Sequence, residues 1–444
     1  MIPGWVLLLV SACYVGLLFL VAYVGDQRAP TGPRLRPAVY ALALAVYCSS
    51  WTFYGAVGTA ARTGLGFLPI YLGPLLLLAF GWRILERLVL VSGEQRIVSI
   101  ADFISSRYGR APGLAALVAA VAVVAAVPYI ALQFKAVAMS VEVLAPGSSH
   151  GTLGDPALYV AALLAAFAIL FGTRQIDATE HHRGMVLAVA LESVVKLLAF
   201  VAIGVLALWH LPGSGTIPAR SLQAAHAVAA QGLPGGFLAQ TLLAFVAMLC
   251  LPRQFHVAVV ECQDPADLRP ARWMFGLYLV LISLMVVPIT LAGTALLRAG
   301  GVSPDAYVLA LPLALDHELL ALFAYLGGFS AATGMVIVAS VALATMVSND
   351  IVMPLVLRSG ALHPAESIDR RVLWVRRVTI VAIALLAYAY HRGAIDSDSL
   401  AQHGLLAFAA VAQFAPALIG GLFWRGASRA GAFAGLLSGA LLWA

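Results

Sequence analysis

Long apolar segments, joined by short polar ones, follow one another along most of the chain. A bilayer core of about 30 Å needs roughly 20 mostly apolar residues per helix, and Gly, Pro and charged residues mark the ends of twelve such segments. We place them at 5–24, 38–60, 66–92, 112–145, 156–173, 183–210, 236–260, 271–297, 317–348, 373–391, 402–424 and from 430 onward. A membrane β-barrel would instead show alternating segments of about ten residues. The pattern therefore predicts an all-α integral membrane protein.

Two of these segments contain stretches that are poor helix formers. Residues 47–55 read YCSSWTFYG, and residues 250–256 read CLPRQFH, where Pro252 removes a backbone donor. Backbone at membrane depth leaves helical pairing only where protein or water satisfies the freed groups. Breaks that lie five segments apart are typical of inverted-repeat transporters, in which the two broken helices form the midplane site.

The spacing predicts a 5+5 (LeuT-like) core. Residues 38–210 would form the first five-helix repeat and residues 236–424 the inverted second repeat. Residues 1–37 would add an accessory helix with its loop. Residues 425–444 would begin a final helix that we expect to be truncated, because it reaches Ala444 after about 15 apolar residues.

Composition and charge agree with a membrane location. Hydrophobic residues make up 62% of the chain and charged residues only 10%, against roughly 25% charged in soluble domains. Of the arginines, 20 fall in connections on one side and four on the other, which predicts an inner-membrane, multi-pass protein with its N-terminus outside. The net charge of +6 is thus a topology signal, and no nucleic-acid partner is expected. The four cysteines show no CxxC pairing, so neither disulfides nor a zinc site are predicted.

Both lysines of the chain, Lys135 and Lys196, fall inside predicted membrane segments. Ionisable groups at that depth face a protein interior or a cavity and usually have a partner. Glu192 precedes Lys196 by one helical turn, which predicts an ion pair, either structural or part of a proton relay. The helix that carries Lys135 also carries a polar strip that could line a cavity, formed by Tyr129, Gln133 and Glu142.

Residues 53–64, 99–109 and 327–351 resemble the sodium/solute symporter family, and six motifs in order resemble one of its branches. They are YCSSWTFYG, IADFISSRYG, PYIALQFKAV, FGTRQIDATEHHRG, LPRQFHVAVVE and MVSNDIVMPL. Within that family the chain most resembles the transporter-like N-terminal membrane domain of CbrA-type hybrid sensor histidine kinases. The resemblance covers essentially the whole chain.

The resemblance implies a sodium ion between the carbonyls of Ala45 and Cys48 and a second set at Gly327, Ser330 and Ala331. Sodium-coupled members have Thr or Ser at the last position, whereas Ala331 has no hydroxyl. A hard cation prefers about six oxygens, so sodium and proton coupling both stay open. Proton carriers would be Lys135, Glu142, Glu192 or His256. No other cofactor or metal is expected.

The resemblance also implies a small polar solute, with an amino acid such as histidine as the leading suggestion. Aromatic, hydroxyl and amide side chains near the breaks could hold it: Trp51, Phe53, Tyr54, Ser49, Ser50, Thr52, Gln133 and Gln254. Alternatively, Trp51 and Phe53 only pack against segment 317–348. Arg253 could bind the solute carboxylate, form a gate together with His256, or reflect the positive-inside bias alone.

Three functions follow from these patterns: a secondary transporter, the input domain of a sensor kinase, and a channel or structural module. We find no phosphoacceptor His motif and no ATP-binding Gly-rich lid, so no enzyme activity is expected. Kinase activity, and with it a response-regulator partner, would require residues beyond Ala444. The tandem His181–His182 is expected to be a solvated turn rather than a metal ligand pair.

Overall fold

The computed structural model describes residues 2–27, 32–147, 155–172, 182–211, 232–358, 368–393 and 400–443, with a few positions between 219 and 226. Every element whose bounds the structure gives is helical. Seven helices in this part are long and apolar enough to cross a membrane, and two bent helix pairs pass the same test together. The chain is therefore an all-α, multi-pass membrane protein, as the hydrophobic pattern predicted.

The long helices are mostly those that the sequence predicts. They are α1 (Gly4–Gln27), α7 (Pro112–Leu144), α9 (Arg183–His210), α13 (Leu268–Leu297), α15 (Glu318–Met346), α17 (Ile368–Gly393) and α18 (Leu400–Ala412) with α19 (Phe414–Phe423). Shorter helices join or flank them: α4 (Pro69–Leu76), α5 (Trp82–Gln95), α6 (Ile100–Arg107), α8 (Pro156–Gly172), α14 (Tyr307–Ala314), α16 (Met353–Arg358) and α20 (Arg429–Trp443).

Three predicted spans do not reach the length and apolarity of a membrane span, so the expectation of twelve was too high for the described residues. Segment 66–92 divides into α4, a π-helical turn at Leu77–Gly81, and α5. Three charged residues in the first two turns of α5, namely Arg83, Glu86 and Arg87, give it a polar face. Helices α8 and α20 have 17 and 15 residues.

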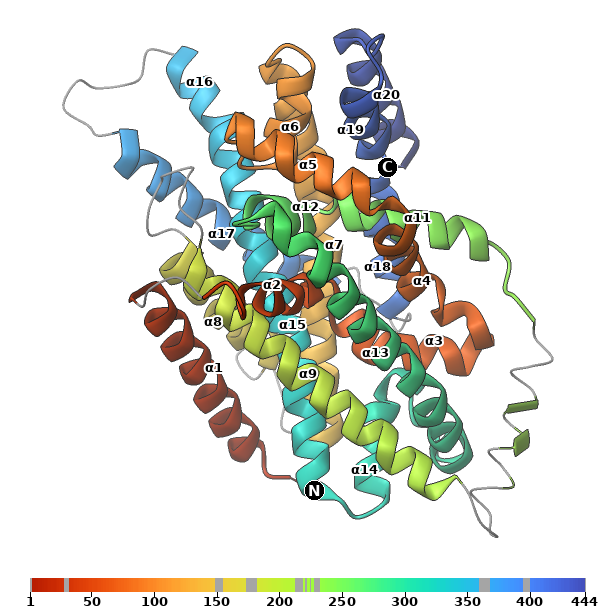
Figure 1. Ribbon diagram of the computed structural model, residues 1–444. Coiled ribbons are helices and arrows are strands. Elements are labelled where there is room, and N and C mark those ends of the chain that lie inside the picture. The colour runs from red at the N-terminus through yellow and green to blue at the C-terminus, as the bar shows by residue number, and fades with distance from the viewer. Residues whose placement is uncertain are drawn as a thin grey trace.

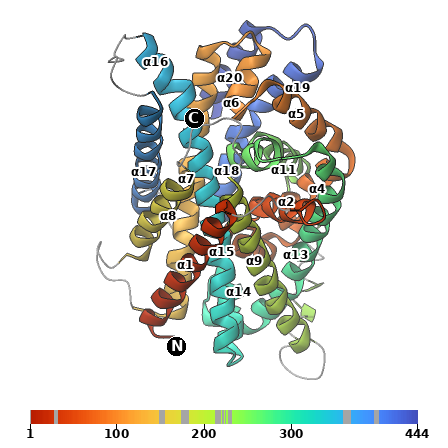
Figure 2. The same cartoon turned by 60° about the vertical axis from the view of Figure 1, so that its left-hand side comes forward.

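Helix α15 lies in the middle of the bundle and is packed by α9, α7, α8 and α17 (Figures 1 and 2). In its most apolar stretch, 94% of the residues are buried. Glycines on this helix allow close packing, because a Cβ on Gly327 or Gly334 would lie within 2.5 Å of side-chain atoms of α9. Small residues bring membrane helices together in this way.

Both predicted breaks are confirmed. The first lies between α2 (Arg36–Leu44) with its 3-10 turn Ala45–Tyr47 and the π-helical turn Trp51–Gly55 that leads into α3 (Ala56–Thr63), and the axis bends by 73° there. The second separates α11 (Phe237–Cys250) from α12 (Pro252–Phe255) and the π-helical turn His256–Val260, with a bend of 53°. Leu251 is extended (φ −63°, ψ 126°) because the following proline disfavours helical backbone.

Candidate functional site: the two helix breaks

The two broken helices run antiparallel, and the part before the first break contacts the part after the second break. Tyr40 donates its hydroxyl hydrogen to the carbonyl of Ala258 (2.5 Å), and one turn later Gln254 Nε2 donates to the carbonyl of Leu44 (3.1 Å). As the residue number rises from Tyr40 to Leu44 in one helix, the number of the partner falls from Ala258 to Gln254 in the other. Gln254, predicted to bind solute, instead satisfies a backbone carbonyl at the end of α2.

Side chains satisfy much of the opened backbone at the first break. Gln133 on α7 accepts a hydrogen bond from the backbone N–H of Ser50 (3.1 Å), and Thr52 Oγ1 donates to the carbonyl of Ser49 (2.8 Å). Tyr71 on α4 donates to the carbonyl of Thr52 (2.8 Å). The polar residues of YCSSWTFYG therefore stabilise non-helical backbone at membrane depth.

The ammonium of Lys196 fills the position that the family resemblance assigns to sodium. Nζ donates to the carbonyls of Ala45 (2.6 Å) and Cys48 (2.9 Å), and the residue is only 2% exposed. These are the two carbonyls predicted as cation ligands. A lysine ammonium carries the same charge as sodium and three donors for such oxygens, so the protein supplies its own cation there.

The expected ion pair between Glu192 and Lys196 is not formed. Glu192 Oε1 accepts from the hydroxyl of Thr333 (2.5 Å), and its Oε2 has no hydrogen-bond partner. Ser330, predicted as a sodium ligand, donates to the backbone carbonyl of Glu192 (2.9 Å) and contacts the hydroxyl of Tyr14 (2.6 Å). Lys196 instead points toward the first break, where the carbonyl of Ala45 also accepts from the backbone N–H of Cys48 (3.0 Å).

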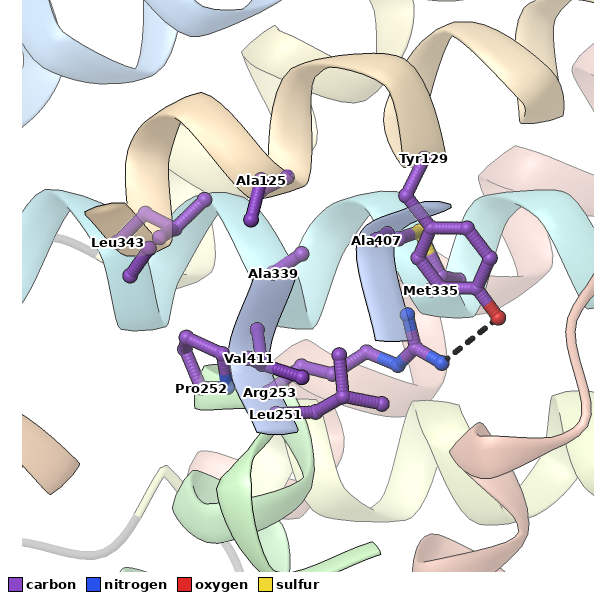
Figure 3. A pocket seen from close by; sticks show the side chains of 12 residues that line it. Ala125, Tyr129, Leu251, Pro252, Arg253, Met335, Ala339, Leu343, Ala407 and Val411 are labelled. Atoms are coloured by element: carbon purple, nitrogen blue, oxygen red, sulfur yellow. Dashed lines mark hydrogen bonds between the residues drawn. The ribbon is translucent and has the colours of Figure 1, made fainter. Parts of the chain in front are cut away.

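Arg253 lies at the second break, fully inside the protein. It is 2% exposed, its Nη2 donates to the hydroxyl of Tyr129 (3.0 Å), and its guanidinium carbon lies 4.4 Å from the centre of the Tyr129 ring (Figure 3). Its Nε and Nη1 have no hydrogen-bond partner among the described residues. Among the described residues no carboxylate forms an ion pair with it.

A cavity of about 20 Å³ lies next to Arg253. Helices α7, α15 and α18 and the second break line it, and Figure 3 shows Tyr129, Arg253, Met335 and Ala407 around it. This volume holds about one water molecule. The structure is thus closed around the arginine.

Aromatic residues of the first break pack against four different helices. Trp51 contacts Phe408 of α18 (ring centres 4.9 Å apart) and lies near Tyr129 (6.4 Å). Phe53 instead contacts Phe200 of α9 (5.1 Å). Packing against segment 317–348 therefore holds for Phe53, which meets Gly327, but the contacts of Trp51 are on α18. Only Trp51 belongs to the group near Arg253.

Of the remaining residues predicted to bind solute or ions, some lie at the breaks and others lie elsewhere in the bundle. Ser49 meets the Tyr129 hydroxyl (3.0 Å), whereas Tyr54 meets Ser140 (3.1 Å). Lys135 is half-buried, and its charge acts on Asp305 and His391. Glu142 is exposed near the end of α7. His256 points away from Arg253, toward Glu261 and His182.

Sequence reasoning missed three residues around these groups. Tyr129 was noted only as part of a polar strip, although it holds Arg253, and Phe408 gave no signal in an ordinary apolar segment. Glu261 directly follows the π-helical turn His256–Val260, so its place near His256 was readable from the sequence. Its contact with His182, 79 residues earlier in the chain, was not.

No family model matches the chain, and no curated protein sequence matches it. Solved structures share its fold. The substrate-bound, outward-open structure of a Na⁺-coupled sialic acid symporter superposes with a TM-score of 0.66 at 12% identity, over 100% of this chain and 98% of that one. The Eremococcus coleocola manganese transporter, in complex with an aromatic bis-isothiourea substituted compound, gives a TM-score of 0.50 at 15% identity, over 94% and 87%.

Proposed function

We propose that the chain is a secondary transporter for a small solute that carries a carboxylate, such as the amino acid histidine, and that Arg253 binds this carboxylate. The observation that carries the proposal is the buried guanidinium with two nitrogens that lack partners. A buried charge that lacks its partner costs several kcal/mol. A planar carboxylate fits a guanidinium in bidentate geometry and would remove this cost.

The charges near the breaks favour the same class of solute. Lys196 and Arg253 are both buried there, with Glu192 as the nearby carboxylate. An anionic group would balance the excess positive charge. Trp51, Tyr129 and Phe408 form an aromatic cluster beside the guanidinium, against which a flat ring such as imidazole could stack.

Transport requires the site to open, because the cavity beside Arg253 is too small for an amino acid. Rocking of one helix group against another around a fixed midplane site would provide this opening. The likeness to a symporter and a metal-ion transporter supports such a cycle, since the whole chain follows that fold. We propose the 5+5 repeat as its structural basis.

We further propose that uptake does not need sodium at the Ala45 and Cys48 carbonyls and is coupled to protons. Lys196 takes the place of the ion there, and Ala331 offers no hydroxyl to complete a sodium site. Loss and gain of a proton on Lys196, with Glu192 as neighbour, would empty and refill that position during the cycle.

Uptake of labelled histidine into proteoliposomes tests the proposal, under a sodium gradient and separately under a pH gradient. Arg253→Gln should lower the apparent affinity about ten-fold or more, because one charge-assisted contact is lost. The matched control is Arg269→Gln, an arginine near the start of α13. Histamine, which lacks the carboxylate, should compete poorly with histidine. Equal competition by histamine, together with unchanged affinity in Arg253→Gln, would overturn the proposal.

The order of motifs favours a second function, the ligand-sensing domain of a CbrA-type kinase. This role would use the same solute site. Histidine binding to the purified chain that depends on Arg253, without uptake under either gradient, would favour sensing over transport.

A further inference from the structure

A second group of ionisable side chains lies around the π-helical turn His256–Val260. It consists of His182, His256 and Glu261, and one nitrogen or oxygen atom from each lies within 4.8 Å of those of the other two. His182 directly precedes α9, and Glu261 follows the π-helical turn. The expectation that His182 lies in a solvated turn is therefore wrong, while His181 lies outside the described residues.

The distances within the group suit a metal ion. Nδ1 of His182 lies 2.9 Å from Glu261 Oε1, and Nε2 of His256 lies 3.2 Å from the same oxygen. Ligand atoms bound about 2.0–2.1 Å from a tetrahedral zinc ion lie roughly 3.3–3.5 Å apart. A small spreading of the three side chains would reach that geometry.

His256 gives an independent sign of a missing ligand. The residue is only 4% exposed, and in the part of the chain that the structure describes neither ring nitrogen has a hydrogen-bond partner. A buried imidazole without partners is costly. Nε2 of His256 lies 3.2 Å from Glu261 Oε1, but the orientation of the two groups does not make a hydrogen bond. A cation between the two residues would use the free lone pair.

Surrounding groups hold the carboxylate in place and leave a path to it. The backbone N–H of His182 donates to both oxygens of Glu261 (3.3 and 3.1 Å), which fixes its orientation as outer contacts do in metal sites. A cavity of about 30 Å³ reaches Glu261 and is lined also by Arg36, Arg183 and Asp267. Water-sized species can thus approach the group.

We propose that His182, His256 and Glu261 bind a divalent transition-metal ion, with zinc as the best fit. Two imidazoles and one carboxylate suit a borderline ion better than magnesium or calcium, which prefer oxygen ligands. The ion connects the start of α9 to the end of the second broken helix. It would therefore tie together two elements that sequence alone places in different repeats.

Metal titration of the purified chain, without a polyhistidine tag and after chelator treatment, tests the site. We expect one Co²⁺ per chain with a visible absorption spectrum typical of tetrahedral nitrogen and oxygen ligands, and displacement of that Co²⁺ by Zn²⁺. His256→Ala and Glu261→Gln should each weaken binding about ten-fold or more. The control is His210→Ala, at the opposite end of α9 from His182.

The test also distinguishes loss of a metal ligand from misfolding of a variant. His182→Ala removes a ligand that is 23% exposed and lies before α9, so it should leave the bundle intact, and the elution profile of each variant checks this. Zn²⁺ should also raise the thermal midpoint of the wild type and not that of Glu261→Gln. Absence of Co²⁺ binding to the wild type, or equal binding by the three ligand variants, would overturn the proposal and leave a plain ion pair between His182 and Glu261.

Discussion

The side chain of Lys196 reaches across from α9 to two carbonyls that the bend of the first broken helix exposes. In this chain Ala331 offers no hydroxyl to a sodium ion. The ammonium of Lys196 instead places a positive charge at the carbonyls of Ala45 and Cys48. These contacts also change what Ala331→Ser should do. With the ammonium in place, the added hydroxyl alone is not expected to produce a sodium response.

Removal of the ammonium should create sodium dependence. In Lys196→Ala, and more strongly in Lys196→Ala with Ala331→Ser, the two carbonyls are free to bind Na⁺. Sodium at 100 times its Kd would stabilise the folded chain by about 2.7 kcal/mol. The measurement is the thermal midpoint in sodium against choline chloride, with Lys135→Ala as control. A midpoint that does not respond to sodium in both Lys196 variants would contradict the assignment of this position.

At the scale of elements, α15 positions the first break through its glycines. The side chain of Tyr54 lies against Gly328, where an added Cβ would sit 1.7 Å from the tyrosine oxygen. The ring of Trp51 likewise lies against Gly404 of α18, 2.2 Å from such a Cβ. These glycines set how closely the helices approach the bend.

Gly328→Ala should therefore destabilise the bundle, because a buried Tyr54 hydroxyl and the helix backbone would have to separate. Overpacking of a dense interior typically costs about 1–3 kcal/mol. The matched control is Gly16→Ala on α1, where nothing lies within 4 Å of the added Cβ. Thermal midpoints in detergent measure the effect. Equal midpoints for the two variants would show that the first break tolerates movement away from α15.

At the scale of the whole molecule, ion pairs join distant segments at both ends of the bundle. Arg36, at the start of α2, contacts Asp264 (2.6 Å) and Asp267 after the second broken helix. Arg62 contacts Asp305 (2.8 Å) at the end of α3. Arg62 thus links the first predicted repeat to the second, and Arg36 links the accessory segment 1–37 to the second.

The Arg36–Asp264 contact should give acid-sensitive stability. The backbone N–H of Ala266 and the guanidinium of Arg36 hold the pKa of Asp264 below its usual value of 3.8. A lowered folded-state pKa adds stability that is complete above the unfolded value and is lost as the pH falls through the folded value. Asp264→Asn should thus lower the thermal midpoint at pH 7, and this difference from the wild type should shrink as the pH falls below 3.8. A difference between wild type and variant that persists at the lowest pH would contradict this account.

The sequence by itself determined the class of the protein and the place of both breaks. Long apolar segments leave helices as the solution in a bilayer, and Pro252 and the hydroxyl-rich run at 47–55 are readable as local interruptions. Among the described residues fewer helices are long and apolar enough to span a membrane than the twelve predicted, because hydropathy marks apolar runs such as α8 without showing their length as helices.

Only the tertiary structure decided which side chains meet at the breaks. Lys196 was read as the partner of Glu192, one turn away on the same helix, but folding brings it to carbonyls 148 and 151 residues earlier. The contacts of Arg253 with Tyr129 and of His182 with Glu261 likewise join residues far apart in the chain. Periodicity shows which residues share a helix face, whereas the partner of a buried charge depends on how whole helices pack, and no local pattern encodes that.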